Sequence, residues 1–114
     1  MSTLSTHVLD VSLGRPAANL PILLEAQIGA TGWKELARGV TNADGRIKDF
    51  LPSGTSLSAG VYRLTFDTAA YFASKKTRGF YPYVQVVFEI AEAGEHYHVP
   101  LLLSPFGFST YRGS

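Results

Sequence analysis

The chain of 114 residues contains no cysteine, so disulfide bonds, thiolate metal ligands and cysteine nucleophiles are excluded. Charge is also scarce, because charged residues make up 17% of the chain and the formal net charge is +1. The basic residues are dispersed, and the longest basic run is Lys75-Lys76. The sequence therefore lacks the electrostatic footprint of a nucleic-acid-binding protein.

Long apolar runs are missing as well. No stretch approaches the roughly 18 apolar residues of a membrane-spanning helix, and the first residues lack the basic and apolar regions of a secretory signal. We therefore expect a soluble, cytoplasmic protein that has no membrane partner. Apolar residues are nevertheless plentiful, at 46% of the chain, which is enough to build a core. The length fits a single domain, residues 1–114.

Short β-rich segments recur between turn signals formed by Gly, Pro, Asn and Asp. The clearest is 61–67, where Tyr62, Leu64 and Phe66 alternate with polar residues, as expected for a half-buried strand. Strands are also predicted at 5–11, 20–28, 33–41, 46–50, 83–90, 96–103 and 106–112, with turns at 12–16, 42–45 and 92–95. Seven to eight such strands predict an all-β fold, a two-sheet antiparallel sandwich.

Two local features modify this pattern. Residues 68–77 break the alternation and contain good helix formers, and Asp67 stands where a helix N-cap would be. We expect one short helix there. Pro100 lies inside the last long apolar run, and because proline cannot donate to a β-ladder, we expect it at an edge or a bulge.

The three histidines are the first candidates for chemistry. His96 and His98 are one residue apart on a predicted strand, so both point to the same face at a spacing of about 7 Å, and His7 lies on another strand. A neutral imidazole can take a proton from water and return it to a leaving nitrogen. Hydrogen-bonded structural histidines are the commoner outcome, and three histidines could also ligate zinc.

Two further features are candidates for binding. Arg46 follows the predicted turn at 42–45, at the start of a strand, where its guanidinium could offer a two-donor fork to an anionic or carbonyl-rich ligand. A solvated charge at a strand end is the alternative. The segment 109–114 follows apolar stretches and has no solubilising tail, so we expect it to be tied down.

Several motifs together resemble one known family, the transthyretin-like 5-hydroxyisourate hydrolases. The matching segments are LSTHVLD at 4–10, GRPA at 14–17, TNADGR at 41–46, FYP at 80–82, HYHVPLLLSP at 96–105 and YRGS at 111–114. They appear in the family order. The YRGS tetrapeptide is the most specific, because in this family it separates the hydrolases from the hormone-carrying transthyretins.

The resemblance implies hydrolytic opening of the six-membered ring of 5-hydroxyisourate during urate degradation, without a metal or an organic cofactor. It implies a transthyretin-like sandwich that assembles into a homotetramer, a dimer of dimers, with its sites at the interface between subunits. The implied catalytic residues are His7, Arg46 and His98. His7, Arg46, Tyr111, Arg112, Gly113 and Ser114 would bind substrate, and His96 would have a supporting role.

The residues by themselves leave two alternatives to a metal-free hydrolase open. One is a non-enzymatic carrier that binds a small aromatic ligand in the central channel, against which the YRGS motif and the histidine pair count. The other is a zinc-dependent sandwich, which a chelator would inactivate.

Overall fold

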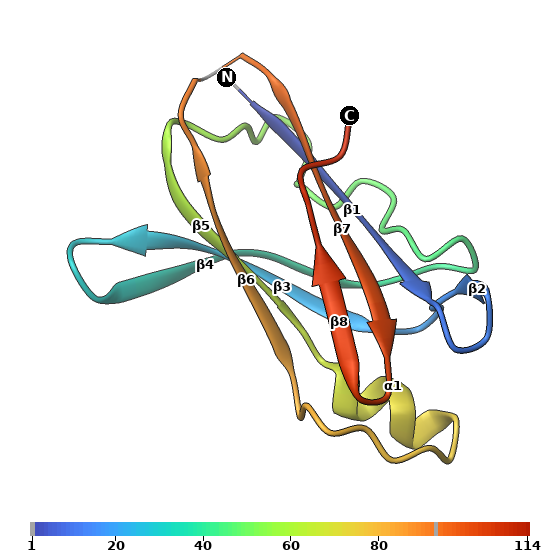
Figure 1. The fold of residues 1–114 in the computed structure, drawn as a ribbon. Helices are drawn as coiled ribbons and strands as arrows, with labels where there is room; N and C mark the ends of the chain where they lie inside the picture. The colour runs from blue at the N-terminus through green and yellow to red at the C-terminus, as the bar shows by residue number, and fades with distance from the viewer. Residues whose placement is uncertain (1, 93) are drawn as a thin grey trace.

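The computed structural model describes residues 2–92 and 94–114. Met1 and Ala93 lie outside the described residues. The turn predicted at 92–95 contains Ala93, so part of that turn also lies outside them. The strands form two four-stranded sheets (Figure 1). One has the order β2 (Arg15–Pro16), β1 (Thr3–Asp10), β7 (His96–Ser104), β8 (Gly107–Thr110); the other has the order β4 (Gly32–Val40), β3 (Pro21–Ile28), β5 (Gly60–Phe66), β6 (Val84–Ile90). The predicted two-sheet sandwich is confirmed.

Neighbouring strands run antiparallel, with the exception of β1 and β7, which are parallel. Their register places Ser5 opposite His98 and Thr3 opposite His96. His96 and His98 on β7 therefore lie beside β1, although each is more than ninety residues away in sequence from its partner on β1. This pair of strands carries most of the candidate site.

The core forms between the sheets because the strands alternate in burial. On β1, Leu4, Thr6, Val8 and Asp10 are buried, whereas the residues between them are only partly buried. The same alternation appears on β5, where the predicted apolar face is buried. The side chains that are fully enclosed between the sheets include Leu20, Leu24, Leu64, Phe66, Val84 and Leu101. The alternation leaves His7 on the outer face of its sheet.

The single helix of the described residues, α1 (Thr68–Ser74), confirms the predicted one. The Asp67 carboxylate accepts a hydrogen bond from the backbone N–H of Ala70 at 3.1 Å, as an N-cap does. The Tyr71 hydroxyl donates to Asp10 Oδ2 at 2.6 Å and so ties the helix to the end of β1. No helix in the described part of the chain has the length and apolarity to cross a bilayer.

Asp10 is 1% exposed, and its carboxylate is fully engaged. Burial alone raises the pKa of Asp10, but hydrogen bonds from Ser12, Tyr71 and Leu13 outweigh it, so the pKa lies below its ordinary value. Burial and the same hydrogen bond raise the pKa of Tyr71. Asp10 therefore fixes the end of β1 rather than taking part in chemistry.

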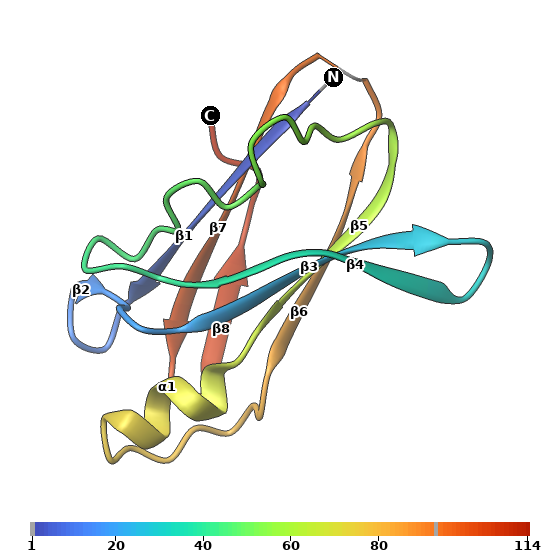
Figure 2. The ribbon, with the colours of Figure 1, turned by 180° about the vertical axis from the view of Figure 1, so that it is seen from behind.

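The strand predicted at 46–50 is wrong. Arg46 forms only an isolated bridge with His7, and a second bridge joins Ser2 to Leu57. A continuous strand does not form because Asp49 has a φ of 55°, outside the β region. The segment instead runs along β1 as an irregular ribbon, visible in green in the view from behind (Figure 2).

The expectation for Pro100 is also wrong. Pro100 lies in β7, an inner strand of its sheet, and no register shift occurs there. The ladder with β8 begins one residue later, at the pair Leu101 and Thr110. The Thr110 hydroxyl donates to the Pro100 carbonyl at 2.7 Å. Because Pro100 has no N–H to offer, the chain after Thr110 leaves the ladder.

Candidate active site

Three histidines share the outer face of the sheet that contains β1 and β7. His7 and His98 are half-buried, and His96 is exposed at the start of β7. The period of two that puts His96 and His98 on one face also puts Ser5 and His7 on one face of β1. The parallel pairing brings these two rows together.

Ser5 links the two histidines of β7. Its Oγ lies 2.7 Å from His98 Nδ1 and 2.9 Å from His96 Nε2. On the far side of His96, the Thr3 Oγ1 lies 2.6 Å from Nδ1. One hydroxyl reaches both rings because it stands opposite His98 in the register and alternate residues of β7 face the same way. The resulting chain runs from Thr3 through His96 and Ser5 to His98.

Arg46 reaches this face through the turn at 42–45. The Asn42 Oδ1 accepts hydrogen bonds from the backbone N–H groups of Asp44, at 2.9 Å, and Arg46, at 3.1 Å. The Gly45 carbonyl accepts from the Val8 N–H at 2.9 Å, which docks the turn on β1. Gly45 has a φ of +74°, and a Cβ there would lie only 2.4 Å from the Val8 carbonyl oxygen. Glycine is therefore required for Arg46 to stand beside His7.

The electrostatics of this face act on His98. Burial lowers the pKa of His98, and the positive charge of Arg46 and the neighbouring His7 and His96 lower it further. The imidazole is therefore held neutral at physiological pH. A neutral imidazole in a half-buried position is the state that a general base requires.

The C-terminal segment closes over His98 through Gly113. The Gly113 N–H donates to the His98 carbonyl at 2.8 Å. A Cβ on Gly113 would lie 2.4 Å from His98 Cδ2, so the glycine backbone packs directly against the imidazole. Tyr111 and Ser114 are exposed on either side of this contact. The expectation that this tail is tied down is confirmed at Gly113.

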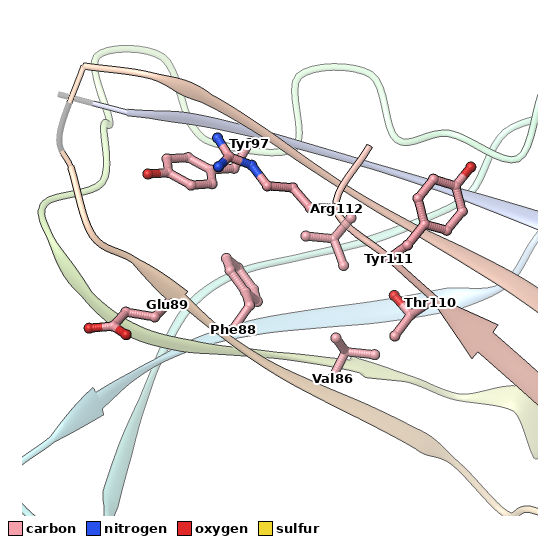
Figure 3. Close-up of a pocket in the computed structure, with 8 residues that line it drawn as sticks. Val86, Phe88, Glu89, Tyr97, Thr110, Tyr111 and Arg112 are labelled. Carbon is pink, nitrogen blue, oxygen red and sulfur yellow. The ribbon is translucent and has the colours of Figure 1, made fainter. Parts of the chain in front are cut away.

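Arg112 points elsewhere. Its guanidinium carbon lies 4.4 Å from the centre of the Tyr97 ring, and Nη2 lies 2.9 Å from Glu95 Oε1. Tyr97 faces the interior of the sandwich, so Arg112 lines a pocket at the open edge between the sheets, with Val86 and Phe88 (Figure 3). In the same view the Tyr111 ring points away from Arg112. The structure therefore does not bring Arg112 to the histidines.

Of the sequence-predicted residues, the structure gathers His7, His96, His98, Arg46 and Gly113 on one face. Sequence reasoning missed three residues that position them, namely Thr3, Ser5 and Gly45. The available signal was the period of two, which places Thr3 and Ser5 on the face of His7. Within residues 2–92 and 94–114, no three His, Asp or Glu side chains are grouped so that they could hold a metal ion.

The fold and this face define a two-sheet sandwich of the transthyretin type with a histidine-rich site on an outer sheet face. The chain belongs to the HIUase/Transthyretin family, whose model matches residues 4–113. A 5-hydroxyisourate hydrolase of Salmonella dublin is 49% identical over 97% of this chain and 80% of its own length.

Two similar solved structures have different functions, one as a hydrolase and one as a thyroxine-binding protein. The 5-hydroxyisourate hydrolase of Klebsiella pneumoniae is 45% identical, with a TM-score of 0.86 and complete coverage of both chains. A sea bream transthyretin in complex with thyroxine is 35% identical, with a TM-score of 0.89 over 96% of this chain and 93% of its own. Because both share the fold, the site must decide between a hydrolase and a carrier.

Proposed function

We propose that this protein hydrolyses 5-hydroxyisourate and opens its six-membered ring. The observation that carries the proposal is the placement of the half-buried His7 and His98 on one outer face. Arg46 lies beside His7, because the backbones of the two residues form an isolated β-bridge. A base, a second imidazole and a cation on one face suit the hydrolysis of a cyclic acyl carbon–nitrogen bond. The identity to several 5-hydroxyisourate hydrolases over nearly the whole chain supports the substrate.

In the proposed mechanism, water attacks the acyl carbon and gives its proton to His98 Nε2. The Nδ1 of the same ring is engaged by Ser5, so Nε2 is the nitrogen that faces the reaction. The carbon–nitrogen bond then breaks, and the leaving nitrogen takes a proton from an imidazolium. His7 orients the water or completes this transfer, and Arg46 stabilises the negative charge that develops on the carbonyl oxygen.

Arg46 has a second effect in this scheme. Its positive charge lowers the pKa of His98, after the larger effect of burial. The same guanidinium therefore holds the base neutral before reaction and balances the oxyanion during it. A lysine would supply the charge without the flat two-donor fork, so Arg46→Lys is a poor replacement.

The remaining parts of the site are proposed by analogy with the family. Tyr111 and Ser114 flank Gly113 and are exposed, so they are available to shape a substrate pocket. Arg112 acts by anchoring the tail through Tyr97 and Glu95. We propose that the pocket is completed in a homotetramer, a dimer of dimers, and that the protein works in the cytoplasm without metal or cofactor. Sedimentation analysis tests the tetramer.

Ultraviolet decay of 5-hydroxyisourate, generated in place from urate, tests the activity. We expect the protein to accelerate the decay with or without EDTA, and His7→Ala and His98→Ala to lose about 100- to 10,000-fold in rate. Decay at the spontaneous rate, together with saturable binding of an aromatic ligand, would leave the carrier as the function. Loss of activity in EDTA would favour the zinc enzyme.

A further inference from the structure

Ser5 is placed to decide which nitrogen of His98 carries the proton. Its hydroxyl owns one hydrogen and contacts two ring nitrogens, His98 Nδ1 and His96 Nε2. Each contact needs one hydrogen between its two heavy atoms. If Ser5 donates to His96, the hydrogen in the other contact must come from His98 Nδ1. If Ser5 donates to His98, then His98 carries its proton on Nε2 and cannot act as a base there.

We propose that Thr3, His96 and Ser5 form a directional hydrogen-bond chain that holds His98 in the Nδ1–H tautomer, with Ser5 accepting from His98 and donating to His96. This inference rests on the proposed hydrolysis, in which His98 Nε2 takes the proton from water. Ser5 and His96 are positioning residues, because they act through His98 and do not meet the substrate.

The hydrogen-bond chain also has a matching donor and acceptor at its outer end, between His96 and Thr3. When Ser5 donates to His96 Nε2, neutral His96 carries its own hydrogen on Nδ1. That nitrogen lies 2.6 Å from Thr3 Oγ1, which can accept it. Each contact in the chain then has one donor and one acceptor. Thr3 and His96 are exposed, so water can satisfy the Thr3 hydroxyl hydrogen.

A device of this kind is needed because an unconstrained neutral imidazole favours the Nε2–H tautomer in water, which is the wrong one for this base. In serine proteases a buried carboxylate corrects the tautomer, and its replacement by an amide lowers kcat about 10,000-fold. Here no carboxylate is required, since His96 provides the acceptor that orients the Ser5 hydroxyl. A neutral chain also avoids placing a negative charge beside an electron-rich substrate.

The chain also stabilises the charged intermediate. After water gives its proton to Nε2, His98 is an imidazolium that still donates its Nδ1–H to the Ser5 oxygen. That hydrogen bond becomes charge-assisted and therefore stronger than in the neutral state. A hydrogen bond with the Ser5 backbone acts in the same sense, because it raises the pKa of His98 against the burial and the positive neighbours that lower it. Ser5 thus supports the transition state more than the ground state, so its loss lowers kcat more than it raises KM.

The first test compares Ser5→Ala with Ser5→Thr. We expect roughly a 100-fold lower kcat in the alanine variant, at the lower limit for losing a general base, with KM within about threefold. The threonine variant keeps a hydroxyl and suits a strand, so it restores most of the rate. Ser109→Ala is the matched control, because Ser109 is exposed on β8 opposite Leu102.

The second test reads the tautomer without any substrate. In ¹⁵N-labelled protein at neutral pH, the nitrogen shifts of His98 distinguish a protonated from an unprotonated ring nitrogen. We expect the Nδ1–H form in the wild type and in Ser5→Thr, and the Nε2–H form in Ser5→Ala. His96→Gln keeps an acceptor for Ser5 and retains the wild-type tautomer, whereas His96→Ala shifts it.

The experiments distinguish failure of the proposed hydrolysis from failure of the proposed hydrogen-bond chain. An Nδ1–H wild type that does not hydrolyse 5-hydroxyisourate keeps the tautomer chain and removes the proposed function. An active wild type with His98 in the Nε2–H form, or a Ser5→Ala variant with unchanged tautomer and kcat, overturns the chain. If Ser5→Ala does not fold, the exposed pair His96→Ala and His96→Gln decides in the same way: equal tautomers and equal rates overturn the proposal.

Discussion

Gly113→Ala is the sharpest test of how the tail organises the site. The added Cβ would lie 2.4 Å from His98 Cδ2, 3.2 Å from Cγ and 3.4 Å from Cβ. Ordinary contact begins near the last of these distances, so either the ring or the tail must move by about 1 Å. The ring cannot move that far without disturbing the 2.7 Å contact between His98 Nδ1 and Ser5 Oγ. If the tail yields instead, the 2.8 Å bond from Gly113 to the His98 carbonyl lengthens.

The two outcomes affect rate and stability differently. A displacement of about 1 Å in a catalytic group can cost about 100-fold in rate, so we expect kcat/KM for 5-hydroxyisourate to fall by about that factor. One partly exposed backbone hydrogen bond contributes only about 1 kcal/mol, which corresponds to a fall in Tm of about 4 °C. Initial rates of ultraviolet decay and differential scanning calorimetry measure the two quantities.

Gly107→Ala is the matched control within the same C-terminal hairpin. A Cβ at Gly107 would meet only Ser104 Oγ, at an ordinary 3.6 Å. We expect kcat/KM to stay within about twofold of the wild type and Tm to change by no more than for Gly113→Ala. A Gly113→Ala variant with wild-type kcat/KM would show that the contact between Gly113 and His98 has no part in positioning the base.

Three further predictions follow from the charges and caps. Arg46→Gln removes a positive charge that lowers the pKa of His98, so the pKa rises and the acid limb of the kcat/KM profile moves to higher pH. Asp10→Asn weakens hydrogen bonds to a buried carboxylate and lowers the free energy of unfolding at pH 7 by about 2 kcal/mol, measured by urea titration. Asp67→Ala removes the N-cap bond to Ala70 and costs about 1 kcal/mol by the same titration.

The sign of the Asp10 effect can be checked against pH. Because its folded pKa lies below the ordinary value of 3.8, the ionised carboxylate stabilises the fold above that value, and this is lost as pH falls through the lower folded pKa. The difference between wild type and Asp10→Asn should therefore shrink below pH 3.8, and a constant difference contradicts the assignment. For Arg46→Gln, an acid limb that stays in place, or moves to lower pH, contradicts the electrostatic role. Wild-type stability of Asp67→Ala would mean that the cap is replaceable.

The local pattern of the sequence determined much of this fold. β-rich composition, apolar runs and alternation between turn signals are properties of each segment by itself, so β1, β3, β5, β6 and β7 were predicted close to their observed bounds. Asp67 and the broken alternation after it predicted α1 for the same reason. The shared face of His96 and His98 also followed from sequence, because residues two apart on a strand point the same way.

The errors arose where a long-range partner decides. Residues 46–50 have strand composition, yet the left-handed backbone at Asp49 and docking on β1 leave only an isolated bridge. Pro100 was expected at an edge because composition does not reveal that β1 and β8 flank β7. The structure shows neither an edge nor a bulge at Pro100, and the ladder with β8 instead begins one residue after it, at Leu101 and Thr110.

The sequence by itself determined most of the strands, the helix and the family, because these depend on composition, periodicity, capping and motif order along the chain. Tertiary structure alone decided that Ser5 stands between two imidazoles, that Gly113 lies on the His98 ring and that Arg112 turns toward Tyr97. The physical reason is register. The parallel pairing of β1 with β7 joins residues more than ninety positions apart, and a shift of one residue would turn Ser5 into the core and separate it from both histidines.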